Sequence, residues 1–216
     1  MNRPRLAPKV LLAEGKDEQR VLPELFELCG IEWPQKNPPV WIEDANGIET
    51  ILGTPLIETE LKVSGLRMLG ILVDANGDID GRWTSLRTRL AAVIPELPLR
   101  AERDGLIYER PDGIRIGVWL MPDNVERGML ETLLLRLRTG EGRLFEHARD
   151  AVAVARTLGA PFIAAHQDKA ELHTWLAWQD PPGQQLHGAV RAKALDALAP
   201  GAAPFVAWFR RLFAIA

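Results

Sequence analysis

The chain has 216 residues, of which 47% are hydrophobic and 25% are charged, and its formal net charge is −3 with a sequence pI of about 5.9. This length and composition fit one sizeable globular domain, and bulk charge gives no support to a basic nucleic-acid-binding surface. Because Cys29 is the single cysteine and no stretch approaches the roughly 20 apolar residues of a membrane span, an internal disulfide and a transmembrane helix are both excluded. We therefore expect a cytoplasmic protein that does not enter a membrane.

The first half of the chain alternates strand patterns with helix patterns. Residues 68–74 form a continuous apolar run, which is typical of a parallel strand covered on both faces. Gly53 and Pro55 weaken one of the predicted helices. The alternation predicts an α/β sandwich around a mostly parallel sheet. The predicted strands are KVLLAEG (9–15), PVWIED (39–44), MLGILVD (68–74) and IRIGVWLMP (114–122), and the predicted helices are DEQRVLPELFELCG (17–30), GIETILGTPLIETELKVSG (47–65) and RWTSLRTRLAAVI (82–94).

The pattern changes to helices after the last of these strands. Residues 106–120 predict a small hairpin, with Asp112-Gly113 as a favoured turn. From about Gly128 onward, five segments have helical spacing (129–140, 143–159, 169–179, 188–199 and 203–216). We therefore expect an α/β core over residues 8–125 and a helical extension over residues 126–216 that packs on this core.

Aromatic and histidine residues of the extension give no clear catalytic pattern. Trp175, Trp178 and Trp208 lie among apolar side chains and are expected to fill the core between the extension and the sheet. His166 and His173 are seven residues apart, and no histidine pair has the spacing of a zinc site.

Carboxylates follow three of the predicted strands. Glu14 comes after KVLLA, Asp74 ends GILVD, and Asp123 follows VWLMP. Ligands of open α/β sheets bind outside the carboxyl ends of the strands, so neighbouring parallel strands would bring these side chains together. Like charges at short distance raise each other's pKa, and a hard cation such as Mg²⁺ prefers carboxylate oxygens. The sequence therefore predicts a cation site at this edge.

Each of these acids also has a purely structural explanation. Glu14 and Glu131 could stabilise the first turns of helices, and Asp123-Asn124 could form an ordinary turn. The word DANGDIDG (74–81) has the aspartates of a calcium loop, but Ser85 stands where an EF-hand has its twelfth-position glutamate. The calcium-binding alternative is therefore not supported.

Two words of the sequence resemble the motifs of the Toprim domain. AEGKDE (13–18) after one strand and LVDANGD (72–78) after a later one are similar to its glutamate-glycine and aspartate-x-aspartate motifs. Toprim domains occur in topoisomerases, DnaG-type primases and nucleases of the old-lysogenisation-defective family, and this resemblance covers roughly residues 8–125. MPDNVERGMLETLL (121–134) and HQDKAELHTWLAWQDPPG (166–183) resemble a compact Toprim-related family of uncharacterised bacterial proteins over nearly the whole chain.

The resemblance implies a set of metal ligands. Asp74, Asn76 and Asp78 would hold Mg²⁺ or Mn²⁺, and Glu14 would share the metal or act as general acid or base. The second aspartate of the family motif is Asn76 here, which keeps a carbonyl oxygen but loses a charge. Asp78 could compensate because Gly77 lets the loop turn back.

The resemblance also implies catalytic cations and leaves two wider alternatives open. Lys16 or Lys169 would neutralise charge on the reacting phosphate, and Asp123 and Glu131 would complete an acidic rim. This set predicts a metal-dependent nuclease acting on DNA or RNA. The alternative is a non-catalytic Toprim-like module that binds a nucleotide or a protein partner, and a third possibility is an α/β protein without a metal. Apolar surface in the C-terminal part could support a homo-oligomer.

Overall fold

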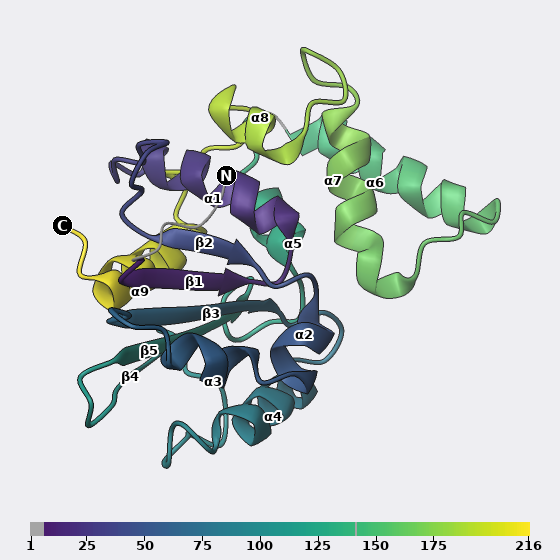
Figure 1. Ribbon diagram of the computed structural model, residues 1–216. Coiled ribbons are helices and arrows are strands. Elements are labelled where there is room, and N and C mark those ends of the chain that lie inside the picture. The colour runs from purple at the N-terminus through teal and green to yellow at the C-terminus, as the bar shows by residue number, and fades with distance from the viewer. Residues whose placement is uncertain (1–6, 141) are drawn as a thin grey trace.

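One mixed sheet forms the centre of the molecule in the computed structural model, which describes residues 7–140 and 142–216 (Figure 1). The strand order within these residues is β2-β1-β3-β5-β4. β2, β1, β3 and β5 are parallel, and β4 pairs with β5 in the antiparallel sense. The strands are β1 (Lys9–Ala13), β2 (Trp41–Asp44), β3 (Met68–Asp74), β4 (Leu106–Glu109) and β5 (Arg115–Met121).

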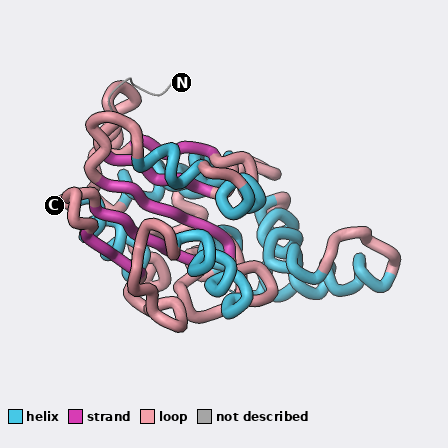
Figure 2. The backbone as a smooth tube through the Cα atoms, turned by 60° about the horizontal axis from the view of Figure 1, so that its bottom comes forward, coloured by secondary structure: helices cyan, strands magenta, loops and turns pink. Residues whose placement is uncertain are grey.

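Helices cover both faces of this sheet, and a pair of helices projects beyond it. One face packs against α2, α3 and α4, and the other packs against α1, α5 and α9. α6 and α7 lie side by side and extend away from the sheet in both views (Figures 1 and 2). The helices are α1 (Lys16–Leu28), α2 (Ile48–Gly53), α3 (Leu56–Leu61), α4 (Ile79–Leu90), α5 (Leu130–Leu135), α6 (Gly142–Thr157), α7 (Gln167–Leu176), α8 (Leu186–Arg191) and α9 (Ala203–Phe213), and a 3₁₀ turn, Ala164–His166, precedes α7.

The predicted α/β class is confirmed, with local differences in the helices. The helix predicted over residues 47–65 is two short helices, because Pro55 has no N–H to continue the hydrogen-bonding of α2 and instead precedes α3. The predicted hairpin is confirmed as β4 and β5, and Gly113 has the positive φ of +83° that its turn requires. None of the described helices is long and apolar enough to cross a membrane.

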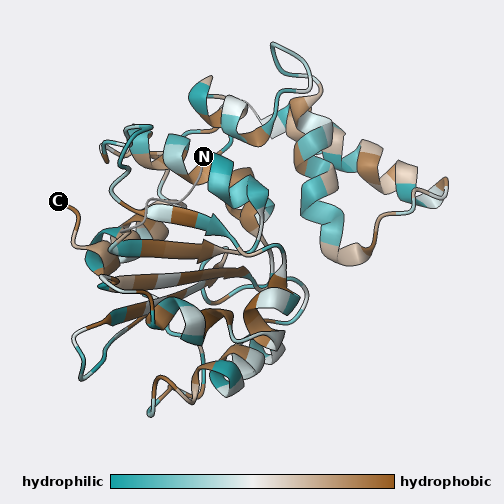
Figure 3. Ribbon diagram, viewed as in Figure 1, coloured by the Kyte–Doolittle hydropathy of each residue, from teal (hydrophilic) through white to brown (hydrophobic). Residues whose placement is uncertain are grey.

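β3 divides the core into two layers. Ile71 and Val73 belong to the apolar cluster that includes α4, whereas Leu72 belongs to the cluster that includes α1 and α5. The strands of the sheet are coloured largely as hydrophobic (Figure 3). Because successive strand side chains point to opposite faces, a strand buried on both sides must be apolar throughout, as residues 68–73 are. The sequence pattern therefore has a direct structural cause.

Two paired glycines allow α9 to lie close to the sheet. Gly70 of β3 is the register partner of Gly117 of β5. A Cβ atom at Gly117 would lie 2.5 Å from Leu212 Cδ2, and one at Gly70 would lie 2.9 Å from Phe213 Cζ. Side chains at these two positions would push α9 away from the sheet.

The tryptophans of the helical part are not all in the core. Trp175 and Trp208 are buried, as predicted. Trp178 is 41% exposed and stacks on His147 of α6 at 5.2 Å between ring centroids, so its predicted burial is wrong. It lies beyond the end of α7, which is at Leu176.

Candidate functional site

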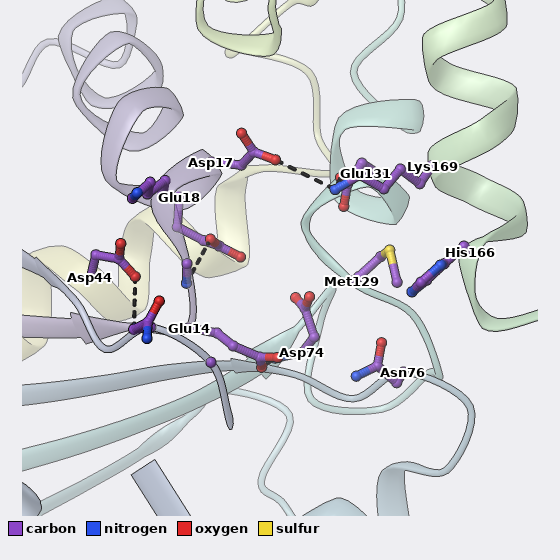
Figure 4. Close-up of a pocket in the computed structure, with 14 residues that line it drawn as sticks. Glu14, Asp17, Glu18, Asp44, Asp74, Asn76, Met129, Glu131, His166 and Lys169 are labelled. Atoms are coloured by element: carbon purple, nitrogen blue, oxygen red, sulfur yellow. Dashed lines mark hydrogen bonds and ion pairs between the residues drawn. The ribbon is translucent and has the colours of Figure 1, made fainter. Parts of the chain in front are cut away.

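A cavity lies at the carboxyl ends of β1, β2 and β3, where the three strands bring acidic side chains together (Figure 4). Ala13 is the register partner of both Asp44 and Leu72, so Glu14 follows β1 beside the ends of β2 and β3. The volume of this strand-end cavity is about 460 Å³. Its lining residues are Glu14, Gly15, Lys16, Asp17, Glu18, Asp44, Asn46, Gly47, Asp74, Asn76, Met129, Glu131, His166 and Lys169.

Glu14 and Asp74 meet directly at the centre of the strand-end cavity. The backbone N–H of Asp74 donates to Glu14 Oε2 at 3.1 Å, and the N–H of Leu130 donates to Asp74 Oδ1 at 3.0 Å. Burial raises the pKa of Glu14, although this hydrogen bond and the charge of Arg82 oppose the shift. The backbone thus fixes both carboxylates, and burial makes their negative charge costly.

Two further carboxylates, Glu18 of α1 and Glu131 of α5, come from the first turns of helices. Glu18 of α1 is 6% exposed, and its Oε2 accepts the N–H of Gly15 at 3.1 Å. Burial, and then the charges of Glu131, Glu14 and Asp17, raise the pKa of Glu18 to about 7. The sequence analysis did not select Glu18, although it lies inside the AEGKDE word.

The four carboxylates act on one another electrostatically. Burial comes first, and then the charges of Glu18, Glu14 and Glu131 raise the pKa of Asp74 well above its ordinary value. The hydrogen bond from the Leu130 N–H opposes this shift. Four acids from two strand ends and two helices therefore share one electrostatic environment, and a positive charge would be favourable within it.

Lys169 supplies such a charge from α7. Its Nζ lies 2.7 Å from Glu131 Oε1 and 3.4 Å from Asp17 Oδ2. Burial alone would lower the pKa of Lys169, but the ion pairs with Glu131 and Asp17 raise it. Lys169 thus connects α7 to α5 and α1 and remains charged over the pH range of ordinary assays.

A hydrogen-bonded threonine fixes α7 against α5. Thr132 Oγ1 accepts the N–H of Met129 at 3.0 Å and donates to the carboxylate of Asp168. Asp168 precedes Lys169, so this contact helps to hold the lysine at the cavity. Asp168 also lies in the first turn of α7, where a carboxylate is favourable.

Asn76 lies in a loop whose backbone is fixed by a neighbouring segment. Its N–H donates to Gly128 O at 2.6 Å, and the Gly128 N–H donates to Asn76 O at 2.8 Å. Asn76 has a φ of +54°, a left-handed conformation that asparagine tolerates better than most residues. Its side chain lines the strand-end cavity beside Asp74 (Figure 4).

Two of the predicted acidic residues do not line the strand-end cavity. Asp78 is the N-cap of α4, and its Oδ1 accepts the N–H of Gly81 at 2.9 Å. Asp123 pairs with Arg136 at 2.7 Å and accepts the N–H of Glu126 at 2.8 Å. In both cases the carboxylate is used by the local backbone or by a neighbouring arginine. The compensation of Asn76 by Asp78 is therefore absent from this arrangement.

Other lining residues could not be selected from local sequence. Lys16 lines the cavity, as expected for a catalytic candidate. Asp44, Met129 and His166 also line it. Asp44 lies in a segment with no recognisable motif, whereas Met129 and His166 lie in the words at 121–134 and 166–183, whose resemblance did not single them out. Their one sequence signal is position, because each stands at the end of a strand or the start of a helix.

The donor chemistry of the strand-end cavity suits a hard cation, but the side chains are not arranged as a finished ligand set. Six carboxylates and two lysines line it, and carboxylate oxygens are the preferred ligands of Mg²⁺. Within residues 7–140 and 142–216, no three His, Cys, Asp or Glu side chains are grouped so that they could hold one metal ion. Side-chain rotation, with displacement of Lys169, would be needed to bring the oxygens around an ion.

The chain matches a family model and is similar to solved structures at low sequence identity. Residues 8–214 match the family described as "Protein of unknown function (DUF3226)". No curated protein matches the chain. The C-terminal region of the Burkholderia pseudomallei OLD protein is 15% identical over 98% of this chain and 100% of that chain, with a TM-score of 0.48. The C-terminal region of the Xanthomonas campestris pv. campestris OLD protein is 15% identical over 97% of each chain, with a TM-score of 0.46. At these levels neither structure assigns a role to a residue of this chain.

Proposed function

Because the chain belongs to the DUF3226 family, a family of unknown function, we propose its activity from the strand-end cavity: a Mg²⁺- or Mn²⁺-dependent phosphoryl-transfer enzyme that acts as a nuclease on DNA or RNA. One observation carries the proposal. Asp74 and Glu14 lie in hydrogen-bonded contact at the ends of two parallel strands, and Glu18 and Glu131 raise the pKa of Asp74 further. Resemblance of the words around Glu14 and Asp74 to Toprim motifs supports the same assignment.

The proposed ligands are Glu14, Asp74 and Asn76. Glu18 and Glu131, whose charges act on Asp74, are further candidates after side-chain rotation, whereas Asp78 and Asp123 are not included because α4 and Arg136 use them. A bound divalent cation would polarise a phosphoryl oxygen and stabilise the charge that develops on it.

The protein's own residues supply the remaining steps. Glu14 accepts the N–H of Asp74, which keeps one carboxylate oxygen at the cavity centre. Burial raises the pKa of Glu14 above that of an exposed glutamate, which suits a general acid or base. Lys169 and Lys16 present ammonium groups that neutralise charge on a phosphate.

The test is a calorimetric titration with Mg²⁺ and Mn²⁺, followed by cleavage assays on single- and double-stranded DNA and RNA. Wild type should bind the cations and cleave at least one substrate. Asp74→Asn should lose cation binding and cleavage, and Glu14→Gln should lose cleavage. Asp150→Asn, at an exposed position of α6, is the matched control. Cleavage that survives in both cavity variants would disprove this assignment of the site.

One observation favours a second function, a non-catalytic module that binds a nucleotide or a protein partner. Lys169 already pairs with Glu131 at 2.7 Å and with Asp17 at 3.4 Å, so part of the negative charge is balanced without a metal. Under this alternative, the purified protein would bind a nucleotide or partner tightly with no turnover. Sustained cleavage that depends on Asp74 would exclude it.

A further inference from the structure

A second cavity of about 350 Å³ adjoins the strand-end cavity and is lined by arginines instead of mainly by carboxylates. We name it the arginine-lined pocket. Asn76 lines both cavities. The residues that line the arginine-lined pocket are Asn76, Gly77, Arg127, Gly128, Arg156, Ala164, Ala165, Gln167 and Asp168.

The two cavities share the segments that form them. Gly128 and Asp168 line the arginine-lined pocket, whereas the residues that follow them, Met129 and Lys169, line the strand-end cavity. The loop at Asn76 is joined to the Gly128 segment by two backbone hydrogen bonds of 2.6 and 2.8 Å. A ligand with two linked binding groups can therefore contact both cavities at once, across the hydrogen-bonded segments at Asn76 and Gly128.

Two arginines give the arginine-lined pocket its charge. Arg127 and Arg156 are exposed, and among the described residues neither forms an ion pair with a carboxylate. Arg156 makes one long contact, 3.4 Å, with the Gln167 amide oxygen, and its guanidinium lies 5.6 Å from the Phe162 ring centroid. Both guanidinium groups are thus free to bind an anion.

The remaining lining residues leave room for an anion and contribute little negative charge. Asp168 is the one carboxylate among the described residues that line the arginine-lined pocket, and it already accepts the hydroxyl hydrogen of Thr132. A Cβ atom added at Gly77 would meet nothing within 4 Å, so the loop there borders open space. Arginine forms strong paired hydrogen bonds with phosphate oxygens, which makes phosphate the natural ligand.

We infer that the arginine-lined pocket binds a second phosphate group of the substrate, next to the one held at the strand-end cavity. This inference rests on the proposed function for the identity of the first phosphate. It adds a second phosphate contact, which favours ligands with linked phosphates. A nucleic-acid strand and a nucleoside triphosphate share this chemistry, and the assay separates them.

The test uses the full-length protein, fluorescein-labelled single-stranded DNA of about 20 nucleotides, and ATP as a competitor. Anisotropy titrations compare wild type with an Arg127→Gln/Arg156→Gln double variant in Ca²⁺ and in EDTA. Removal of two phosphate contacts should weaken binding at least about tenfold and lower the slope of log affinity against log salt by about 1.4. Arg143→Gln, an exposed arginine at the other end of α6, is the matched control and should leave both quantities unchanged.

The outcomes separate this inference from the proposed function. Arginine-dependent binding of DNA, or of ATP in its place, supports the pocket and identifies the source of the phosphate, even if the protein neither binds Mg²⁺ nor cleaves. Equal affinity of wild type and the double variant overturns the inference, even if Asp74-dependent cleavage is found. Failure of wild type to bind either ligand also overturns it. Thermal melting of all variants checks that each is folded.

Discussion

Glu18→Gln is expected to change how the stability of the metal-free protein depends on pH. In the folded chain, burial and the charges of Glu131, Glu14 and Asp17 raise the pKa of Glu18 to about 7 from an ordinary value of 4.5. A carboxyl group with a raised folded pKa contributes stability that is fully present below the unfolded pKa and is lost as the pH rises through the folded pKa. The wild-type protein should therefore become less stable between these two values.

The size of this effect follows from the two pKa values. Between about pH 5.5 and about pH 8.5, a group with these values loses about 2 kcal/mol of its contribution to the free energy of unfolding. Glutamine keeps an oxygen that can accept the Gly15 N–H, so Glu18→Gln removes the charge with little change of shape. Loss of this charge also relieves Asp74, which changes the pH dependence in the same direction.

The assay is urea unfolding in EDTA at the two pH values, followed by tryptophan fluorescence. From the lower to the higher pH, wild type should lose about 2 kcal/mol more than Glu18→Gln. Glu27→Gln, at an exposed position of the same helix, should behave as wild type. The same pH dependence in wild type and Glu18→Gln would show that the carboxyl group titrates normally and would refute the reasoning.

Three further substitutions test the cavity and the sheet. Asp74→Asn should raise the melting temperature in EDTA, because burial and the neighbouring carboxylates disfavour the charged form of Asp74. It should also abolish the additional stabilisation by Mg²⁺, which for wild type is about 2.7 kcal/mol at 100 times the dissociation constant. Lys169→Gln should destabilise the protein at neutral pH by about 1 kcal/mol, because Glu131 stays buried without its ion pair while the exposed part of the lysine limits the loss. Gly117→Ala should cost about 1–3 kcal/mol in urea unfolding, because the new Cβ would overlap Leu212.

Each of these substitutions has a control that differs in one respect. Asp150→Asn and Lys36→Gln change the same charges at exposed positions and should shift stability by less than about 0.5 kcal/mol. Gly53→Ala adds the same methyl group at a helical position where nothing lies within 4 Å, so it should be neutral or stabilising. A Gly117→Ala protein as stable as wild type would contradict the close packing of α9.

Much of the fold follows from local sequence. The run at residues 68–74 predicts β3 at its observed bounds, and Asp112-Gly113 predicts the turn between β4 and β5. Prediction failed in places where long-range packing decided the outcome. Trp178 has an apolar neighbourhood in sequence, yet it lies beyond the end of α7, is 41% exposed and stacks on His147 instead.

Some residues of the candidate site could likewise be selected from local sequence, and others could not. Glu14 and Asp74 could be selected because both follow apolar strands, and carboxyl ends of neighbouring parallel strands meet at one edge. Asp78 also lies shortly after an apolar strand in the sequence, but its carboxylate accepts a backbone hydrogen bond in the first turn of α4. Spacing alone cannot distinguish a capping aspartate from one that faces a cavity, because both conformations are available to a short glycine-containing loop.

The sequence by itself determined the order of strands and helices and the two carboxylates at the strand ends, since both depend on hydrophobic periodicity and on residues that are neighbours along the chain. The tertiary structure alone decided that Glu18 and Glu131 join these carboxylates and that Lys169 pairs with Asp17, 152 positions away in the sequence. It also placed Arg127 and Arg156 on one pocket. The physical reason is that these contacts arise when α5 and α7 pack beside the sheet edge, and no local pattern records how separate segments pack.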